Sequence, residues 1–511
     1  MNRIAKIFTL GLITVTGLSS CEKFLDVNTN PNAPSQETIS LSAKFPAALV
    51  ATVNQEQGQI NQIGAFWGGY WGTTNEAVNS FIDLKSYNGL AIMHQRDGIP
   101  VWETAYNNLF YLELIKREAL AENALSYAGA AKIMQGWLFL RLVDMYNNIP
   151  FDEALRGFEI ATPKYEPGKT VYEKSINLIT SGIADIKNHK DGPGISKMGN
   201  DDILFKGVAN MWYKFGNTIK LRALIRQSEA GNQAYIDAEI NKIVSEGSGF
   251  LSVSENAYIQ PGYLNSSGKL NPFWENYYKT VQAKATTNYT AIRPTIYAIN
   301  KYKGLNDPRL SNLYVTVAGE YKGVLFGNPN SNDPIYGQAV TSAFKGPAEN
   351  DNKAAALFKS FSQPSVLMGS FESLFLQAEA AERGWISGSA QTLYENAIKE
   401  SFKYMEVGAT DFIAYNLQPT VNYNIPTTTV GKIERIIEQK WLALNSISSI
   451  EAWNDYRRLN LPNIPNSLDA PSSTARPLRL MYPETERMTN NDEASKQGND
   501  DMITGKIWWM K

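Results

Sequence analysis

The stretch FESLFLQAEAAERGWISGSAQTLYENAIKESFKYM, residues 371–405, decides the fold class of this chain. Apolar residues recur at helical spacing over 371–383 and again over 392–405, which predicts a pair of helices. Small and large residues are spaced as in a tetratricopeptide unit at Leu374, Ala378, Ala390, Tyr394 and Ala397. The alanines let two helices approach closely, and the tyrosine fills the groove between them. A helical hairpin unrelated to this repeat is the alternative.

The same helical period extends to both sides of this pair. Residues 130–138 carry apolar side chains at i, i+3, i+4, i+7 and i+8, so we expect a helix that ends near Tyr146. Capping-box pairs predict two further helix starts, at Thr170 with Glu173 and at Ser448 with Glu451. The first of these helices should run to about Asn188. Other helices are expected at 205–230, closed by Gly231, and at 236–244 and 432–444.

Residues 247–365 lose this period and are rich in Gly, Pro, Asn, Ser and Tyr. A long irregular stretch inside a compact protein usually carries function or short strands. We therefore expect an all-α, mainly helical fold of tetratricopeptide-like hairpins with one long loop-rich region. The expected divisions are a signal peptide at 1–20, a lipidated tether at 21–39 and one domain at 40–511. Within that domain we expect helical residues 40–246, an irregular insert 247–365, helical residues 366–460 and a C-terminal tail 461–511.

Composition excludes several classes of function. The chain has 511 residues, with 48 Lys plus Arg against 50 Asp plus Glu, and this balance argues against a nucleic-acid binder. One cysteine and two histidines exclude an intrachain disulfide and a Cys/His zinc cluster. Any histidine-dependent nucleophile would have to use His94 or His189. We expect no cofactor and no metal site.

The first 21 residues are typical of a secretory signal. Arg3 and Lys6 precede residues 7–18, an uncharged run too short to span a bilayer. Leu18-Ser19-Ser20-Cys21 resembles the bacterial lipobox, in which the cysteine becomes the first mature residue and is acylated, for example with palmitate. We therefore expect lipidation at Cys21 and contact with the membrane through that anchor only. An ordinary cleavable signal, with Cys21 a bystander, is the alternative.

The tether that follows imitates a calcium-binding loop. Asp26, Asn28, Asn30 and Glu37 have the spacing of such ligands, but the position that needs glycine is Pro31. A Pro/Asn-rich stalk is the better interpretation.

Several stretches together resemble the SusD/RagB family of nutrient-binding outer-membrane lipoproteins. They occur in family order over nearly the whole chain, at 24–31, 142–151, 378–385, 394–398, 438–444, 451–458, 481–483 and 508–509. One departure is Asn147-Asn148, where the family often has Gly-Asp, and Asn tolerates the same turn geometry.

This resemblance implies a helical scaffold with an irregular half that faces the ligand. It also implies display on the outer membrane, as the cap of a TonB-dependent, SusC-like transporter. The expected activity is capture of oligosaccharides or other nutrients without catalysis. The shared motifs, Lys440-Trp441 and Trp453 among them, are expected to pack and brace the fold.

Sugar recognition requires flat aromatic surface with amide or carboxylate partners beside it. Two clusters supply both, and their ligand-binding candidates are Trp67, Tyr70, Trp71 and Asn75 in the first and Trp274, Tyr277 and Tyr278 in the second. The glycines of the first cluster predict an exposed, bent backbone with its aromatic rings on the surface. Packing of these rings in the core is the alternative at both clusters.

Two other functions are compatible with the anchor. A lipid-anchored polysaccharide hydrolase would need two facing carboxyl groups or an activated nucleophile, and the sequence contains no G-x-S-x-G motif. His94 and the acid pairs Asp152-Glu153 and Asp500-Asp501 are the only suggestive groups, and ordinary surface contacts explain them. A helical-repeat scaffold with only protein ligands would not need the aromatic-rich insert.

Overall fold

The protein is described by a computed structural model that covers residues 39–471 and 474–511. The signal peptide, Cys21 and most of the tether lie outside these residues. In the part of the chain that the structure describes, no helix has the length and apolar character needed to cross a membrane.

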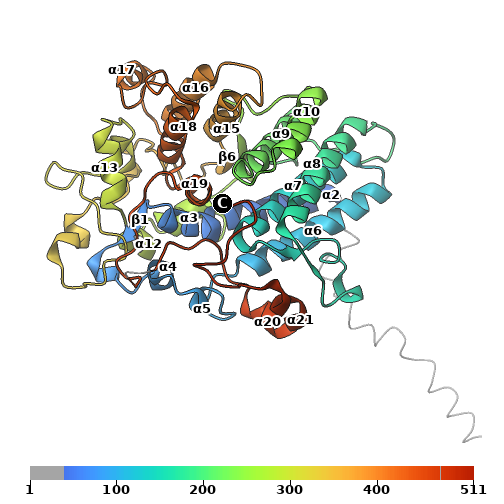
Figure 1. The fold of residues 1–511 in the computed structure, drawn as a ribbon, viewed down its shortest axis with the longest axis horizontal. Coiled ribbons are helices and arrows are strands. Elements are labelled where there is room, and N and C mark those ends of the chain that lie inside the picture. Colours follow the sequence, from blue (N-terminus) through green and yellow to red (C-terminus); the bar gives the residue numbers. More distant parts are fainter. Residues whose placement is uncertain (1–38, 472–473) are drawn as a thin grey trace, which may run out of the picture.

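Antiparallel helix pairs form one half of the molecule (Figure 1). The N-terminal helices are α2 (Leu41–Gln55), which continues through a π-helical turn (Glu56–Ile60) into α3 (Asn61–Trp67), then α6 (Val101–Ala121), α7 (Leu125–Tyr146), α8 (Gly168–Asn188), α9 (Ala209–Arg226) and α10 (Gln233–Glu246). The later ones are α15 (Ser370–Glu382), α16 (Ala390–Tyr404), α18 (Thr429–Leu444) and α19 (Ser449–Leu459). The mainly helical fold is as predicted.

Short elements fill the rest of the chain. Helical segments of this kind are α4 (Ile82–Ser86), α5 (Gly89–Ile92), α11 (Pro272–Tyr277), α12 (Thr287–Ala291), α13 (Ile296–Gly304), α14 (Leu310–Leu313), α17 (Asp411–Leu417), α20 (Glu484–Thr489) and α21 (Asn491–Ala494). Three two-stranded antiparallel sheets pair β1 (Trp71–Thr73) with β5 (Ile292–Pro294), β2 (Ile149–Pro150) with β3 (Tyr165–Glu166), and β4 (Ala257–Ile259) with β6 (Ser365–Met368). The expected irregular region therefore contains only short helices and strands.

Close helix contacts depend on small residues, as the repeat pattern predicts. α7 packs on α8 where two glycines meet: a Cβ on Gly129 would lie 2.3 Å from the carbonyl oxygen of Gly182. In the α15–α16 pair, Ala378, Ala397 and Tyr394 are fully buried, and the Tyr394 hydroxyl donates to the carbonyl of Val421 at 2.6 Å. The predicted hairpin is confirmed.

Helix starts deviate from the capping-box predictions. α8 begins at Gly168, after Pro167, so Thr170 lies inside the helix rather than at its cap. Ser448 does precede α19, but its side chain makes no capping bond and Glu451 faces buried arginines instead. The helix expected from 205 begins at Ala209, because the Asp202 carboxylate holds the preceding residues in a turn through the amides of Leu204, Phe205 and Gly207.

Candidate functional site

The first aromatic cluster is part of the core. Trp67, Tyr70 and Trp71 are fully buried, so the exposed platform expected there is absent. The N–H or O–H group of each ring has a hydrogen-bond acceptor inside the fold. Trp67 Nε1 donates to the carbonyl of Leu84 at 2.9 Å, and Tyr70 Oη donates to the carbonyl of Trp441 at 2.6 Å. Trp71 Nε1 donates to Ser446 Oγ at 2.8 Å. Burial raises the pKa of the Tyr70 phenol well above its usual value.

The second cluster meets the first in that core. Tyr277 and Tyr278 are buried, and the Tyr277 ring lies edge-on to Trp71 with ring centroids 4.9 Å apart. Trp274 is half-buried, and its ring lies edge-on to that of Tyr278 with ring centroids 4.7 Å apart. Asn75 is half-buried and its Nδ2 donates to the carbonyl of Asp333 at 2.8 Å. Of the seven ligand-binding candidates, only Trp274 and Asn75 keep exposed surface.

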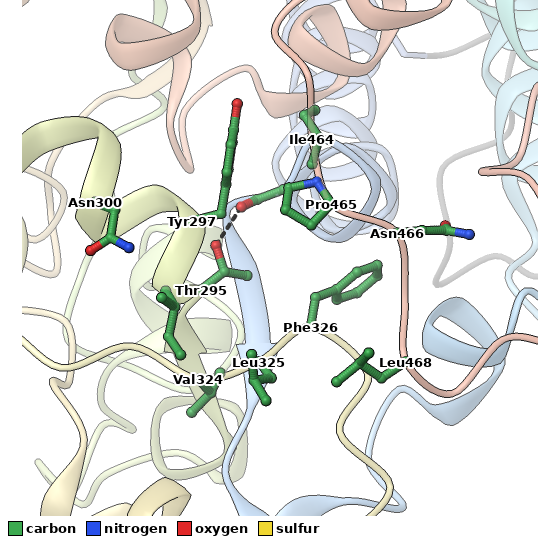
Figure 2. Close-up of a pocket in the computed structure, with 12 residues that line it drawn as sticks. Thr295, Tyr297, Asn300, Val324, Leu325, Phe326, Ile464, Pro465, Asn466 and Leu468 are labelled. Atoms are coloured by element: carbon green, nitrogen blue, oxygen red, sulfur yellow. Dashed lines mark hydrogen bonds between the residues drawn. The ribbon is translucent and has the colours of Figure 1, made fainter. Parts of the chain in front are cut away.

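A pocket of about 270 Å³ includes Gly69, the residue just before Tyr70 of the first cluster, in its lining (Figure 2). It is bounded by three parts of the chain that are distant in sequence: the glycine turn before β1, the segment from β5 into α13 with the nearby loop 324–326, and the C-terminal tail. Its lining residues are Gly69, Thr295, Ile296, Tyr297, Asn300, Val324, Leu325, Phe326, Ile464, Pro465, Asn466 and Leu468.

Backbone hydrogen bonds build the floor of this pocket. β1 pairs with β5, and the Thr295 amide donates to the carbonyl of Tyr70 at 2.9 Å. The Thr295 hydroxyl donates to the carbonyl of Gly69 at 2.6 Å. On the other side the Val324 amide donates to the carbonyl of Pro294 at 2.9 Å, and the Ile296 amide donates to that of Val324 at 2.8 Å. The floor is therefore a rigid, three-segment platform.

Two glycines of the aromatic motif permit this close assembly. Gly69 has φ +83°, and a Cβ there would lie 2.4 Å from Ile464 Cγ2. A Cβ on Gly72 would lie 2.6 Å from Val324 Cγ2. These glycines serve close packing of the backbone against the insert and the tail, and this is why the rings beside them are covered rather than exposed.

Polar groups are few in the pocket. Tyr297 is half-buried, its hydroxyl has no hydrogen-bond partner, and burial raises the pKa of this phenol. Asn300 is exposed, and no described residue bonds its carboxamide. The Asn466 Oδ1 accepts from the Tyr87 hydroxyl at 2.6 Å. In Figure 2 the Tyr297 ring stands between Asn300 and the tail residues Ile464 and Pro465, with Phe326 opposite.

A charged hollow of about 350 Å³ adjoins this pocket, since α13 and the tail contribute to both. Lys301 and Glu438 form an ion pair there at 2.7 Å. A larger hollow of about 690 Å³ lies over α16 and α17, where Phe402 and Phe412 adjoin two lysines and the carboxylates of Glu400 and Glu406. Another hollow, of about 270 Å³, places Trp102, Tyr106 and Phe110 beside Asn107 and Glu486. The pocket around Tyr297 also combines aromatic side chains with carboxamides in the pattern that sugars need, and it is the one of these three that the irregular insert lines.

The groups that the sequence suggested for catalysis make ordinary surface contacts. His94 lies on an exposed loop with its Nε2 3.6 Å from Glu484. Asp152 pairs with Lys174 and Asp500 pairs with Arg487, each at 2.5 Å. No group of three or more His, Cys, Asp or Glu side chains within 39–471 and 474–511 could hold a metal ion.

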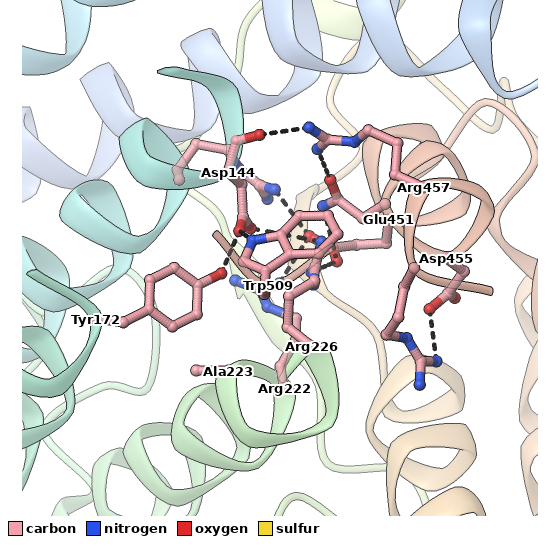
Figure 3. A network of polar contacts seen from close by, with 12 residues as sticks. Asp144, Tyr172, Arg222, Ala223, Arg226, Glu451, Asp455, Arg457 and Trp509 are labelled. Carbon is pink, nitrogen blue, oxygen red and sulfur yellow. Dashed lines mark hydrogen bonds and ion pairs between the residues drawn. The ribbon is translucent and has the colours of Figure 1, made fainter. Parts of the chain in front are cut away.

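The charged residues of the helical motifs form a buried network (Figure 3). Glu451 of α19 pairs with Arg226 of α9 and with Arg141 of α7, the latter at 2.8 Å. Trp509 Nε1 donates to Asp144 Oδ1 at 3.0 Å. Burial opposes ionisation of Glu451, but the surrounding arginines outweigh burial and hold the pKa of this carboxyl well below its usual range. These motifs brace the helices, as expected. Glu451, Asp144 and Trp509 do not line the pocket, whereas the Trp441 ring of another motif packs edge-on to Tyr297 with ring centroids 5.6 Å apart.

The pocket residues were missed in the sequence. Tyr297, Asn300 and Phe326 belong to the irregular insert, and Asn466 and Leu468 belong to the tail. The loss of helical period marked the insert as the functional region, but no local motif singles out these positions, because three distant segments assemble the pocket.

Comparisons with known proteins identify the relatives of this architecture. A family model named SusD-like, described as "Starch-binding associating with outer membrane", matches residues 31–483. No curated protein matches the sequence significantly.

Solved structures share the fold over nearly the whole chain. A SusD homologue from Bacteroides fragilis is 21% identical, with a TM-score of 0.72, over 92% of this chain and 99% of its own. A chitin-binding SusD homologue from Flavobacterium johnsoniae is 24% identical, with a TM-score of 0.73, over 92% and 98%. A SusD homologue from Bacteroides uniformis is 21% identical, with a TM-score of 0.72, over 92% and 99%.

Proposed function

The chain belongs to the SusD-like family of starch-binding proteins that associate with the outer membrane, and from this membership we propose that it is a receptor that captures glycans or similar nutrients. The observation that carries the proposal is the pocket around Tyr297, where an aromatic side chain and an uncommitted carboxamide border a rigid floor. Aromatic surface binds the C–H face of a sugar, and amides bind its hydroxyls.

Anchoring at the outer membrane is the second part of the proposal. Acylation of Cys21 would tether the domain by the predicted stalk of 19 residues, 21–39, which precedes α2. Several acyl chains on one cysteine give durable attachment, because each buried CH₂ contributes about 0.8 kcal/mol. The family description, association with the outer membrane, supports this location, and display on the cell surface would expose the pocket to nutrients.

Delivery of the captured nutrient to a transporter is the third part of the proposal. We assign the role of partner to a TonB-dependent, SusC-like transporter, which would receive the captured oligosaccharide. The support is family membership together with the anchor, because a bound nutrient must still cross the outer membrane. Isolation of the anchored protein with its membrane neighbours tests this partner directly, and absence of any transporter from that complex would count against it.

Binding without turnover follows from the same site. The pocket lining contains no carboxylate, histidine or cysteine, so it has no pair of groups that could act as acid and base. The chitin-binding relative from Flavobacterium johnsoniae supports a carbohydrate ligand for this fold.

A calorimetric screen of the protein beginning at Glu22 tests the proposal. Maltooligosaccharides, cello-oligosaccharides, xylo-oligosaccharides and chitooligosaccharides are titrated, and the ligand is then recovered and analysed for cleavage. Saturable binding with intact ligand is expected. Reproducible cleavage would favour a lipid-anchored hydrolase, and failure to bind any glycan would favour a scaffold with protein ligands only.

A further inference from the structure

The lining of the Tyr297 pocket is unusual for a site that would hold a plain sugar ring. Aliphatic side chains are the largest group in the lining, with Ile296, Val324, Leu325, Ile464 and Leu468 against two aromatic residues, Tyr297 and Phe326. Flat aromatic rings match the C–H face of a pyranose, whereas a small aliphatic hollow matches methyl groups. The shape of the apolar surface therefore favours a ligand with a methyl-bearing substituent.

The few hydrogen-bonding groups of the pocket also favour a ligand with a methyl-bearing substituent. The uncommitted group that a ligand can reach is the Asn300 carboxamide, since Asn466 Oδ1 already accepts from Tyr87 and the unpaired Tyr297 hydroxyl is covered by protein atoms. A sugar inserted through its hydroxyl groups would leave several of them unpaired, and each unpaired buried hydroxyl is unfavourable. An acyl group needs fewer partners, because only its carbonyl and, in an amide, its N–H require hydrogen bonds.

Charge restricts the ligand further. None of the lining side chains is ionisable at neutral pH. The nearest buried cation, Arg476, lies behind the Phe326 ring at 5.6 Å and donates to the carbonyl of Trp67 at 2.8 Å. Beside the lining, Lys301 Nζ lies 5.9 Å from the centroid of the Tyr297 ring and already pairs with Glu438 at 2.7 Å. A charged sugar would have to break this ion pair to gain a partner, because Arg476 is only 3% exposed.

We propose that the pocket selects neutral glycans that carry acyl groups, such as N-acetylated or O-acetylated sugars, and binds the acyl methyl among its aliphatic side chains. This proposal rests on the proposed function. The acyl carbonyl accepts from the exposed Asn300 amide, and the sugar ring lies outside the aliphatic hollow.

Two matched pairs of oligosaccharides test the selectivity. Chitotetraose and cellotetraose share length and linkage and differ at C2, and acetylated and deacetylated xylotetraose differ only in ester groups. De-N-acetylated chitotetraose adds the cationic form. We expect the acylated member of at least one pair to bind about tenfold more tightly than its partner and than the cationic form. Equal affinity within both pairs, or preference for the unacylated or charged form, overturns the inference.

Leu468 provides a variant that does not disturb the core, because it is 56% exposed. Leu468→Asn should reduce the preference for the acylated ligand at least about threefold, since a methyl contact is lost. Leu417→Asn is the matched control, because Leu417 is 71% exposed on α17 and does not line the pocket. Equal loss in both variants would overturn the assignment to this pocket.

Failure of the proposed function has a different signature. A protein that binds unsubstituted glycans tightly and shows no acyl preference keeps its receptor function and refutes only the selectivity. A protein that binds no member of either pair and no maltooligosaccharide refutes both proposals.

Discussion

Replacing Trp71 with alanine separates a core role from a ligand-binding role for the aromatic motif that is most prominent in the sequence. The side chain is fully buried, with the Tyr277 ring centroid 4.9 Å away and Phe66 at 5.9 Å. Its Nε1 donates to Ser446 Oγ, and Ser446 keeps a second partner because its own hydroxyl donates to Asn445 Oδ1 at 2.9 Å. The variant therefore loses packing without leaving Ser446 fully unpaired.

The magnitude follows from the truncated volume. Truncation of a buried Trp to Ala costs about 3–5 kcal/mol. The unfolding entropy is about 2.1 cal/mol/K per residue, so a folded unit of roughly 470 residues has an unfolding entropy of about 1 kcal/mol/K. The expected fall in Tm is therefore about 3–5 °C.

Scanning calorimetry of the protein beginning at Glu22 measures this shift. Trp274→Ala is the matched control, because that tryptophan is half-buried and should lower Tm less than half as much. Glycan affinity is titrated on the same two variants. An unchanged Tm for Trp71→Ala together with a large loss of glycan affinity would refute the assignment of Trp71 to the core.

Three other substitutions test the network, the pocket and the anchor. Glu451→Gln leaves Arg141 and Arg226 without their shared carboxylate, so the free energy of unfolding at pH 7 should fall by about 3–5 kcal/mol. The pKa of Glu451 is lowered in the fold, so its stabilisation is present above about pH 4.5 and is lost as the pH falls further. The gap in Tm between variant and native protein should therefore narrow below about pH 4.5, and a constant gap would contradict this. Gly69→Ala places a methyl 2.4 Å from Ile464 Cγ2 at a residue with positive φ. The free energy of unfolding should therefore fall by about 1–3 kcal/mol, and calorimetry should show weaker glycan binding. Unchanged unfolding free energy and glycan affinity would show that close approach is not required there. Cys21→Ala should release folded protein from membrane fractions on immunoblots, and retention after high-salt washing would exclude the lipid anchor.

Helices were predictable because their signal is local. Apolar spacing placed α7, whose end at Tyr146 is as predicted, and α15, α16 and α18 to within a few residues. Caps were less predictable, since Glu451 has the spacing of a capping box yet is drawn to arginines from helices far away in sequence. A long-range ion pair of this kind leaves no trace in a local window.

The site was less predictable than the fold for a physical reason. A glycine beside an aromatic residue is compatible with exposed backbone and also with close approach of another segment, and Gly69 and Gly72 serve the second purpose. The close approaches at these two glycines bring Val324 and Ile464 to the pocket, whereas Tyr277 and Phe344 pack against the Trp71 ring. Tyr297 and Asn466 meet only in the folded chain, so their sequence neighbourhoods do not identify them.

Affinity of Tyr297 variants for a glycan is the most direct test of the central claim. Truncating a tyrosine at the centre of a binding site typically costs about 2 kcal/mol or more, which is about thirtyfold in Kd. Tyr297→Ala should therefore weaken binding of the glycan selected in the calorimetric screen by at least about thirtyfold. Tyr213→Ala, which removes a half-buried tyrosine of α9 that does not line the pocket, should leave Kd unchanged. Equal affinity of the Tyr297→Ala variant and the native protein would contradict the account.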